Sequence, residues 1–136
     1  MTPVLGTGAD VIIGSHACDL LLAAGHTVVS VDNFSTGQRS NLAQAFVRPG
    51  FCLMEADVCA PGALDRIAAE ARPDAIIHLA VLVSMQESVQ DPGLNFELNL
   101  RGTHLIAEAA RLHGIACVVI ASSAVIYGDA QTLPLT

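Results

Sequence analysis

Lysine and tryptophan are absent from this 136-residue chain, and Tyr127 is its only tyrosine. The six basic residues are therefore all arginines, and against thirteen acidic residues they leave a net charge of −7. A chain this acidic offers no basic face to nucleic acid, so that class of partner is excluded. The longest uncharged apolar run, residues 75–83, is too short to cross a bilayer, so we expect no membrane span.

Disulfide and metal-site patterns are missing as well. The four cysteines, Cys18, Cys52, Cys59 and Cys117, form no Cys-x-x-Cys pair and no Cys/His spacing typical of a metal site. Each lies in or beside an apolar segment, so we expect buried free thiols in a reducing compartment. Residues 1–3 lack the basic start of a secretion signal, which makes a cytoplasmic location the expectation.

The chain does contain a regular alternation of apolar strands and amphipathic helices. Strands are predicted over residues 4–5, 27–31, 51–54, 75–79 and 116–121, and helices over 13–24, 41–46, 63–71 and 94–113. This alternation predicts an α/β fold, a doubly wound Rossmann-type parallel sheet of about five strands with helices on both faces, ending before a sixth strand. The 52% hydrophobic content fits strands that are buried on both faces.

A glycine-containing turn follows the first predicted strand. Residues 7–14 read Thr-Gly-Ala-Asp-Val-Ile-Ile-Gly, and Asp32 ends the second strand eighteen residues later. In a dinucleotide-binding unit such a turn lets a pyrophosphate approach a helix N-terminus. Val11 stands where the middle glycine is usual, which adds bulk, and adds strain if the backbone needs a positive φ there. Asp10 adds a negative charge near the expected phosphates.

Asp32 is the clearest candidate for a ligand-binding residue. A carboxylate at this strand end accepts hydrogen bonds from both ribose hydroxyls and repels a 2′-phosphate, which favours NAD over NADP. Arg39, a nearby arginine, is the type of residue that NADP binding uses. The alternative for Asp32 is a carboxylate that only caps a turn.

Six motifs in order resemble those of the NAD-dependent sugar-nucleotide epimerase/dehydratase family, which belongs to the extended short-chain dehydrogenases. They are residues 13–16, 31–37, 56–58, 77–80, 99–103 and 122–128. The resemblance covers nearly the whole chain and is greatest to UDP-glucose 4-epimerases. It implies that residues 1–136 are an incomplete NAD-binding Rossmann domain that lacks the substrate-binding C-terminal lobe.

The resemblance also assigns residues to the cofactor. The NAD-binding residues it implies are Thr7, Gly8, Val11, Ile13, Gly14, Asp32, Asn33, Asp57, Val58, Leu79, Ala80, Val81 and Asn99. Asn33 would assist at the ribose, while Asp57 with Val58 would hold the adenine; the alternative for Asp57 is a loop cap. Asn99 would brace the active-site backbone, with a solvated helix face as its alternative. His78 is expected to be a core histidine with a backbone partner.

Catalysis is implied only in part. By resemblance Ser123 is the catalytic residue and would hydrogen-bond the reacting sugar hydroxyl, with a strand-end cap as the alternative. Ser84 would touch the nucleotide-sugar, unless the loop that it begins is merely solvated. The family's base is the tyrosine of a Tyr-x-x-x-Lys pair. Tyr127 is followed by Gln131 in the lysine position, so we expect the chain to be inactive alone.

Two functions therefore stay open. The first is the NAD-binding portion of a UDP-glucose 4-epimerase-like enzyme, which takes a hydride from a nucleotide-sugar and returns it through NAD. The alternative is a non-catalytic remnant, or a regulatory or interaction module that binds nucleotide weakly. Because no sixth strand is predicted, an exposed sheet edge should favour a homodimer or an aggregation-prone chain.

Overall fold

Five strands alternate with helices in the computed structural model, which describes residues 2–128. The strands are β1 (Pro3–Thr7), β2 (Thr27–Asp32), β3 (Phe51–Glu55), β4 (Ala75–His78) and β5 (Cys117–Ile120). The helices are α1 (Ile12–Ala23), the 3₁₀ turn η1 (Arg39–Leu42), α2 (Ala43–Phe46), α3 (Ala63–Ala71), α4 (Met85–Gln90), α5 (Pro92–Asn95), the π-helical η2 (Phe96–Arg101), α6 (Gly102–His113) and the 3₁₀ turn η3 (Ala124–Tyr127). Every predicted strand is present, and α4 lies within residues 81–92, where the sequence allows a loop with one helical turn at residues 85–89.

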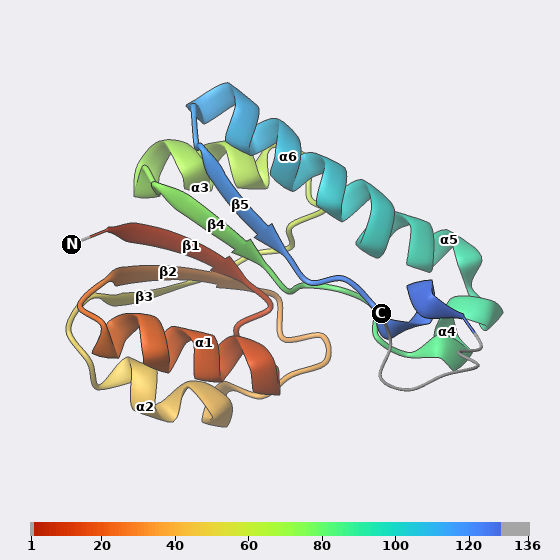
Figure 1. Cartoon of the computed structure of the whole chain (residues 1–136), viewed down its shortest axis with the longest axis horizontal. Helices are drawn as coiled ribbons and strands as arrows, with labels where there is room; N and C mark the ends of the chain where they lie inside the picture. The colour runs from red at the N-terminus through yellow and green to blue at the C-terminus, as the bar shows by residue number, and fades with distance from the viewer. Residues whose placement is uncertain (1, 129–136) are drawn as a thin grey trace.

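The strands form one fully parallel sheet in the order β3-β2-β1-β4-β5 (Figure 1). The chain adds β2 and β3 on one side of β1, then crosses to add β4 and β5 on the other. The Rossmann-type fold class is therefore confirmed. A doubly wound sheet has its ligand crevice where the winding reverses, at the carboxyl ends of the strands. Here that point lies between β1 and β4.

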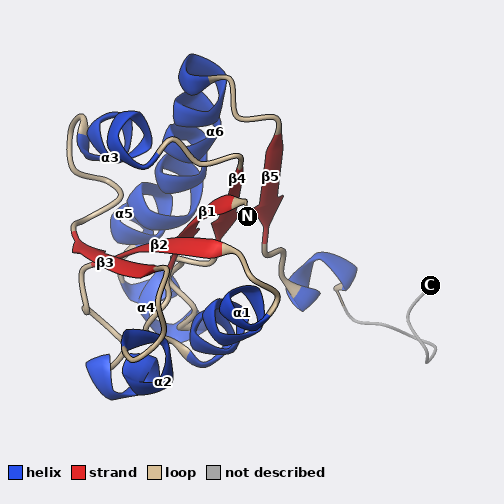
Figure 2. Ribbon diagram, turned by 90° about the vertical axis from the view of Figure 1, so that its left-hand side faces the viewer, coloured by secondary structure: helices blue, strands red, loops and turns tan. Residues whose placement is uncertain are grey.

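Helices cover both faces of the sheet (Figure 2), with α1 and α2 on one face and α3 and α6 on the other. The larger core lies under α3 and α6 and includes Leu5, Ile76 and Ile106, all fully buried. The smaller core lies under α1 and α2, around Val28 and Leu42. Burial of the central strands from two sides explains the apolar composition.

The predicted long helix runs from Pro92 to His113 but is not uniform. Its middle segment, η2, is a π-helical turn that ends directly before Gly102. A π-helical turn inserts one residue and rotates the side chains after it. Gly114 ends α6 in the left-handed conformation, and Gly25 follows α1 in the same conformation.

The cysteine prediction is wrong in part. All four cysteines are free thiols, yet only Cys18 and Cys59 are buried, whereas Cys52 and Cys117 are exposed. The exposed pair belongs to β3 and β5, the two edge strands, whose side chains are covered on fewer sides. Within residues 2–128, no helix is both long and apolar enough to cross a membrane.

Candidate functional site

A cleft opens at the carboxyl ends of β1, β2 and β4 and extends toward the loop after β5. Its inner part is lined by predicted site residues from four separate segments: Gly8, Val11, Asp32, Asn33, Asp57, Val58, Leu79, Ala80 and Val81. Its outer part is lined by Val11, Ile13, Val81, Asn99 and Ser123, with Ser122 beside them. The fold thus gathers residues up to 115 positions apart in sequence at the expected crevice.

Close packing requires the first and last glycines of the turn. Gly8 has φ +70°, and a Cβ there would lie 2.6 Å from the backbone of Leu79 and Ala80. A Cβ on Gly14 would lie 1.9 Å from the Gly8 carbonyl oxygen. Gly14 therefore lets α1 pack against the turn that follows β1, and Gly8 lets this turn pass close to the end of β4. Neither position tolerates a side chain without a backbone shift.

The backbone at Val11, the middle position of the turn, does not meet the condition for strain, which was a positive φ. Its backbone has φ −88° and ψ 166°, an extended conformation that valine adopts readily. Val11 is the N-cap residue of α1, and its carbonyl accepts the first helical hydrogen bond, from Ser15 N at 2.9 Å. The N–H groups of residues 12–14 precede that bond and have no partner within the helix, an arrangement that suits an anion. What Val11 adds to the cleft is side-chain bulk.

Thr7 lies beneath the turn and outside the cleft lining, as does Gly14. The Thr7 hydroxyl is 2.7 Å from His78 Nδ1 and accepts a hydrogen bond from Ala80 N at 3.4 Å. His78 therefore has a side-chain partner, not the backbone partner that was expected. Burial lowers the pKa of His78, so its imidazole is neutral at physiological pH. The contacts of the Thr7 hydroxyl with His78 and with Ala80 N join β1 to β4 and to the backbone that follows β4.

Asp32 is held in one orientation by two backbone donors. Its Oδ1 accepts from Phe34 N at 2.9 Å and its Oδ2 accepts from Asp10 N at 3.2 Å. The carboxylate thus does cap the following turn, and it also lines the cleft. Arg39 is engaged elsewhere: it forms an ion pair with Glu55 and lies 4.5 Å above the Phe34 ring.

Asp10 lies in the lining of both parts of the cleft, and its expected place beside the phosphates stays a prediction. It is 1% exposed, and its carboxyl group packs over Gly37, where a Cβ would lie 2.1 Å from Asp10 Cγ. Its backbone carbonyl accepts hydrogen bonds from Gln38 N at 3.3 Å and Asn41 Nδ2 at 2.5 Å. Asp10 therefore connects the turn to the loop that follows β2.

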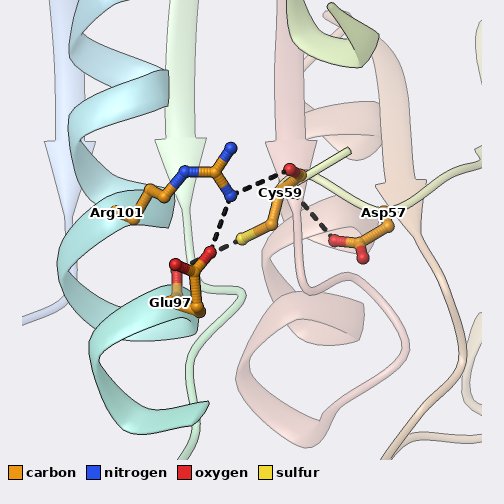
Figure 3. Close-up of polar contacts among 4 residues, drawn as sticks. All are labelled: Asp57, Cys59, Glu97 and Arg101. Atoms are coloured by element: carbon orange, nitrogen blue, oxygen red, sulfur yellow. Dashed lines mark hydrogen bonds and ion pairs between the residues drawn. The ribbon is translucent and has the colours of Figure 1, made fainter. Parts of the chain in front are cut away.

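The loop after β3 is tied to the long helix (Figure 3). Asp57 Oδ1 accepts a hydrogen bond from Cys59 N at 2.8 Å, so Asp57 is a loop cap as well as a residue of the cleft lining. Arg101 donates to the Cys59 carbonyl at 3.2 Å and to Glu97 Oε2 at 2.7 Å. The Cys59 thiol donates to the Glu97 carbonyl at 3.3 Å. These contacts fix Asp57 and Val58 relative to η2.

Asn99, on η2, braces the backbone that follows β4. Its Oδ1 accepts from Leu82 N at 2.7 Å and its Nδ2 donates to the Leu82 carbonyl at 3.2 Å. A solvated helix face is therefore not its environment. Ser84 caps α4 by accepting from Glu87 N at 3.2 Å and lies outside the cleft lining, so a contact with substrate stays a prediction for it. Ser123 is exposed at the outer rim.

Sequence reasoning missed the residues that join these segments. Leu82 and Asn41 line the cleft but carry no motif that marks them, and Gly37, the last residue of the motif over residues 31–37, was assigned no role. Hydrogen bonds to a backbone, like those of Leu82, leave no sequence pattern. Gly37 gave the one usable signal, because a glycine after a turn can indicate that another group packs closely over it.

The NAD dependent epimerase/dehydratase family matches residues 4–136 of the chain. A UDP-glucose 4-epimerase of Mycolicibacterium smegmatis is 41% identical over 131 residues, which are 96% of this chain and 42% of that protein. A UDP-glucose 4-epimerase of Homo sapiens is 36% identical over 140 residues, 97% of this chain and 40% of that protein.

Solved structures of the same kind of enzyme superimpose closely. The crystal structure of UDP-glucose 4-epimerase from Brucella ovis in complex with NAD has a TM-score of 0.88 and 32% identity, covering 99% of this chain and 40% of that one. The enzyme from Bifidobacterium longum in complex with NAD⁺ and UDP has a TM-score of 0.90 and 31% identity, covering 99% and 41%. The chain thus spans about 40% of the length of these relatives.

Proposed function

This chain belongs to the NAD dependent epimerase/dehydratase family, and we propose that it is the cofactor-binding portion of a UDP-glucose 4-epimerase-like enzyme, with NAD bound in the cleft. The observation that carries the proposal is the meeting of Gly8, Asp32, Asp57 and Val58 in one cleft at the winding reversal of the sheet. These residues come from three loops, and each belongs to a motif that resembles the family's NAD-binding pattern.

The residues present fit a dinucleotide. The N-terminus of α1 offers unpaired N–H groups to a pyrophosphate, and Gly8 lets the turn before it pass close to the end of β4. The Asp32 carboxylate, already aligned by Phe34 N and Asp10 N, is positioned to accept from ribose hydroxyls. Asp57 and Val58, held by the contacts to η2, would bind the adenine. Bound NAD would supply reversible hydride transfer with a nucleotide-sugar.

The chain's own share of the chemistry is binding and orientation. Ser123 lies at the outer rim, at the end of the cleft opposite the adenine-binding residues, and would hydrogen-bond the reacting sugar hydroxyl. Ser84 would contact the same substrate if its loop rearranged. The general base is not among these residues, since the sequence contains no lysine and its one tyrosine, Tyr127, has Gln131 four positions on. The base and the rest of the sugar site would come from elsewhere.

A second function, a module that binds nucleotide weakly without catalysing a reaction, is supported by Val11, whose side chain adds bulk to the cleft. In both cases the partner of the cleft is NAD, and the nucleotide-sugar is a partner only of the catalytic form. We also propose a cytoplasmic location, which the four free thiols support. The acidic net charge of −7 gives no support to nucleic acid as a partner.

Calorimetric titration with NAD tests the shared proposal. Asp32→Asn keeps one acceptor oxygen but removes the charge, so we expect NAD affinity to fall by roughly tenfold or more, in line with about 1.5–3 kcal/mol for a hydrogen bond to a charged group. Asp74→Asn is the matched control, because Asp74 is an exposed acid outside the cleft lining. Equal affinities for wild type and Asp32→Asn would reject the proposed site.

A further inference from the structure

Asp10 and Asp32 place two carboxyl groups side by side at the floor of the cleft. Asp10 is 1% exposed and Asp32 is 8% exposed, and both line the same cleft. The Asp10 backbone N–H donates to Asp32 Oδ2 at 3.2 Å, so the Asp32 carboxylate lies against the backbone of Asp10. Among the described residues, Asp10 Oδ2 has no hydrogen-bond partner. Two ionised carboxylates can only accept hydrogen bonds, so a hydrogen bond between them requires that one of them carries a proton.

No cation near the pair compensates a second negative charge. The loop from 33 to 38, the segment from 79 to 83 and residues 12–15 of α1 contain no charged residue. His16, the next residue of α1, is exposed, and its Nδ1 lies 2.8 Å from the Ile12 carbonyl oxygen. On η1, Arg39 pairs with Glu55 instead. From the loop after β3, Asp57 adds a further carboxylate to the cleft lining. Apart from the partial positive charge of the α1 N-terminus, these elements are neutral, acidic or already paired.

We propose that Asp10 and Asp32 form one acid pair that binds NAD while a single proton is shared between them, so that loss of this proton weakens binding. This inference rests on the proposed function, since it concerns NAD in the same cleft. With the proton in place the pair carries one negative charge and Asp32 stays an acceptor for ribose hydroxyls. When the proton leaves for solvent, a second buried charge faces a ligand whose pyrophosphate is itself negative, and the two repel.

The titration range follows from the surroundings of Asp10. Burial, the hydrogen bond to Asp32 and the charge of Asp32 raise the pKa of Asp10 from its usual 3.8 to about 7, although the Asp10 and Gly37 backbone N–H groups act in the opposite direction. A group with that pKa is ~90% protonated at pH 6 and ~10% at pH 8. If only the protonated pair binds, NAD affinity should fall about tenfold between these two pH values.

NAD titrations at pH 6 and pH 8 test the proposal on the wild type, Asp10→Asn and Asp74→Asn. The wild type and the Asp74→Asn control should bind about tenfold more weakly at pH 8. Asp10→Asn, which is neutral at both pH values, should bind with the same affinity at both. A wild type whose affinity does not change, or an Asp10→Asn variant that keeps the tenfold change, would overturn the proposal.

Infrared spectroscopy of the ligand-free chain separates this inference from the proposed function. A protonated-carboxyl band that disappears between pH 6 and pH 8 in the wild type, and is absent from Asp10→Asn over that range, would support the shared proton. A chain that shows this band but binds no NAD at either pH would reject the proposed function and, with it, the role of the pair in binding. A chain that binds NAD but lacks the band would overturn the acid pair alone.

Discussion

Asp10 N lies 3.2 Å from Asp32 Oδ2 and donates a hydrogen bond to it, which joins the glycine turn to the end of β2. The turn is where a pyrophosphate is expected, and Asp32 is where a ribose is expected. The contact therefore sets the spacing between two parts of one ligand site. It also leaves the Asp10 carboxyl group buried beside a second carboxyl group, with consequences for stability as well as for binding.

Stability should depend on the protonation of Asp10. The pKa of Asp10 in the folded chain, about 7, is above its usual 3.8, so the folded state binds more protons than the unfolded state between these values. Stability should therefore fall as pH rises from about 4 to about 7 and then level off. Asp10→Asn should lose this component and melt higher than the wild type at pH 8. If the melting temperatures of the two proteins change with pH by the same amount from pH 4 to pH 8, this expectation is contradicted.

Gly8 and Gly62 form a matched pair, because both have φ +70° but only Gly8 is enclosed. Gly62→Ala should cost about 1–2 kcal/mol for the left-handed backbone alone. Gly8→Ala should cost a further ~1–3 kcal/mol, because its Cβ would lie 2.6 Å from the backbone of Leu79 and Ala80. Urea unfolding of both variants measures the difference. Equal losses would mean that the turn does not pass as close to β4 as described.

Val11→Gly tests whether the substituted turn is strained. Release of about 1–3 kcal/mol of backbone strain would raise NAD affinity by roughly 5- to 150-fold. Because Val11 is extended at φ −88°, no such strain exists to be released, and we expect a gain of less than about fivefold from the smaller side chain. Calorimetric titration of the wild type and of Val11→Gly with NAD measures the gain in affinity. A gain of tenfold or more would restore the strained interpretation.

The free edge of β5 should cause self-association. β5 pairs with β4, and no other described strand pairs with it, while Val119 and Ile120 are 51% and 43% exposed. An apolar edge of this kind is a template for pairing with a second copy. Val119→Lys should shift the sedimentation profile toward monomer, whereas Val47→Lys, at an 82% exposed position after α2, should not. A wild type that stays monomeric at all concentrations would refute the expected homodimer.

The fold was largely predictable because its signals are local. Apolar runs and the glycines at 25 and 114 mark strands and helix ends by themselves. The π-helical turn η2 was not predictable, since nothing in its sequence distinguishes it from ordinary helix, and only the bonds of Asn99 and Arg101 to distant segments show what it positions. The exposure of Cys52 and Cys117 depended on the strand order, which spacing alone does not give.

In the site, too, the residues marked by local signals could be predicted and those that depend on distant contacts could not. Asp32 and Gly8 could be identified because strand ends and turns have fixed roles in this fold. The contrast is Asp10, whose burial against Gly37 depends on how the loop after β2 folds back over the turn. The absence of strain at Val11 likewise depends on backbone angles that the residue type does not determine.

The most direct test of the NAD site is an NMR titration of the isotope-labelled chain with NAD at pH 6. We predict amide shift changes at residues 8–14, 32–36, 56–58 and 79–83, the four segments that line the cleft. Residues 113–116, at the opposite end of the sheet, should not change. Saturable changes confined to the cleft would support the account. Changes centred on residues 113–116, or none at any NAD concentration, would contradict it.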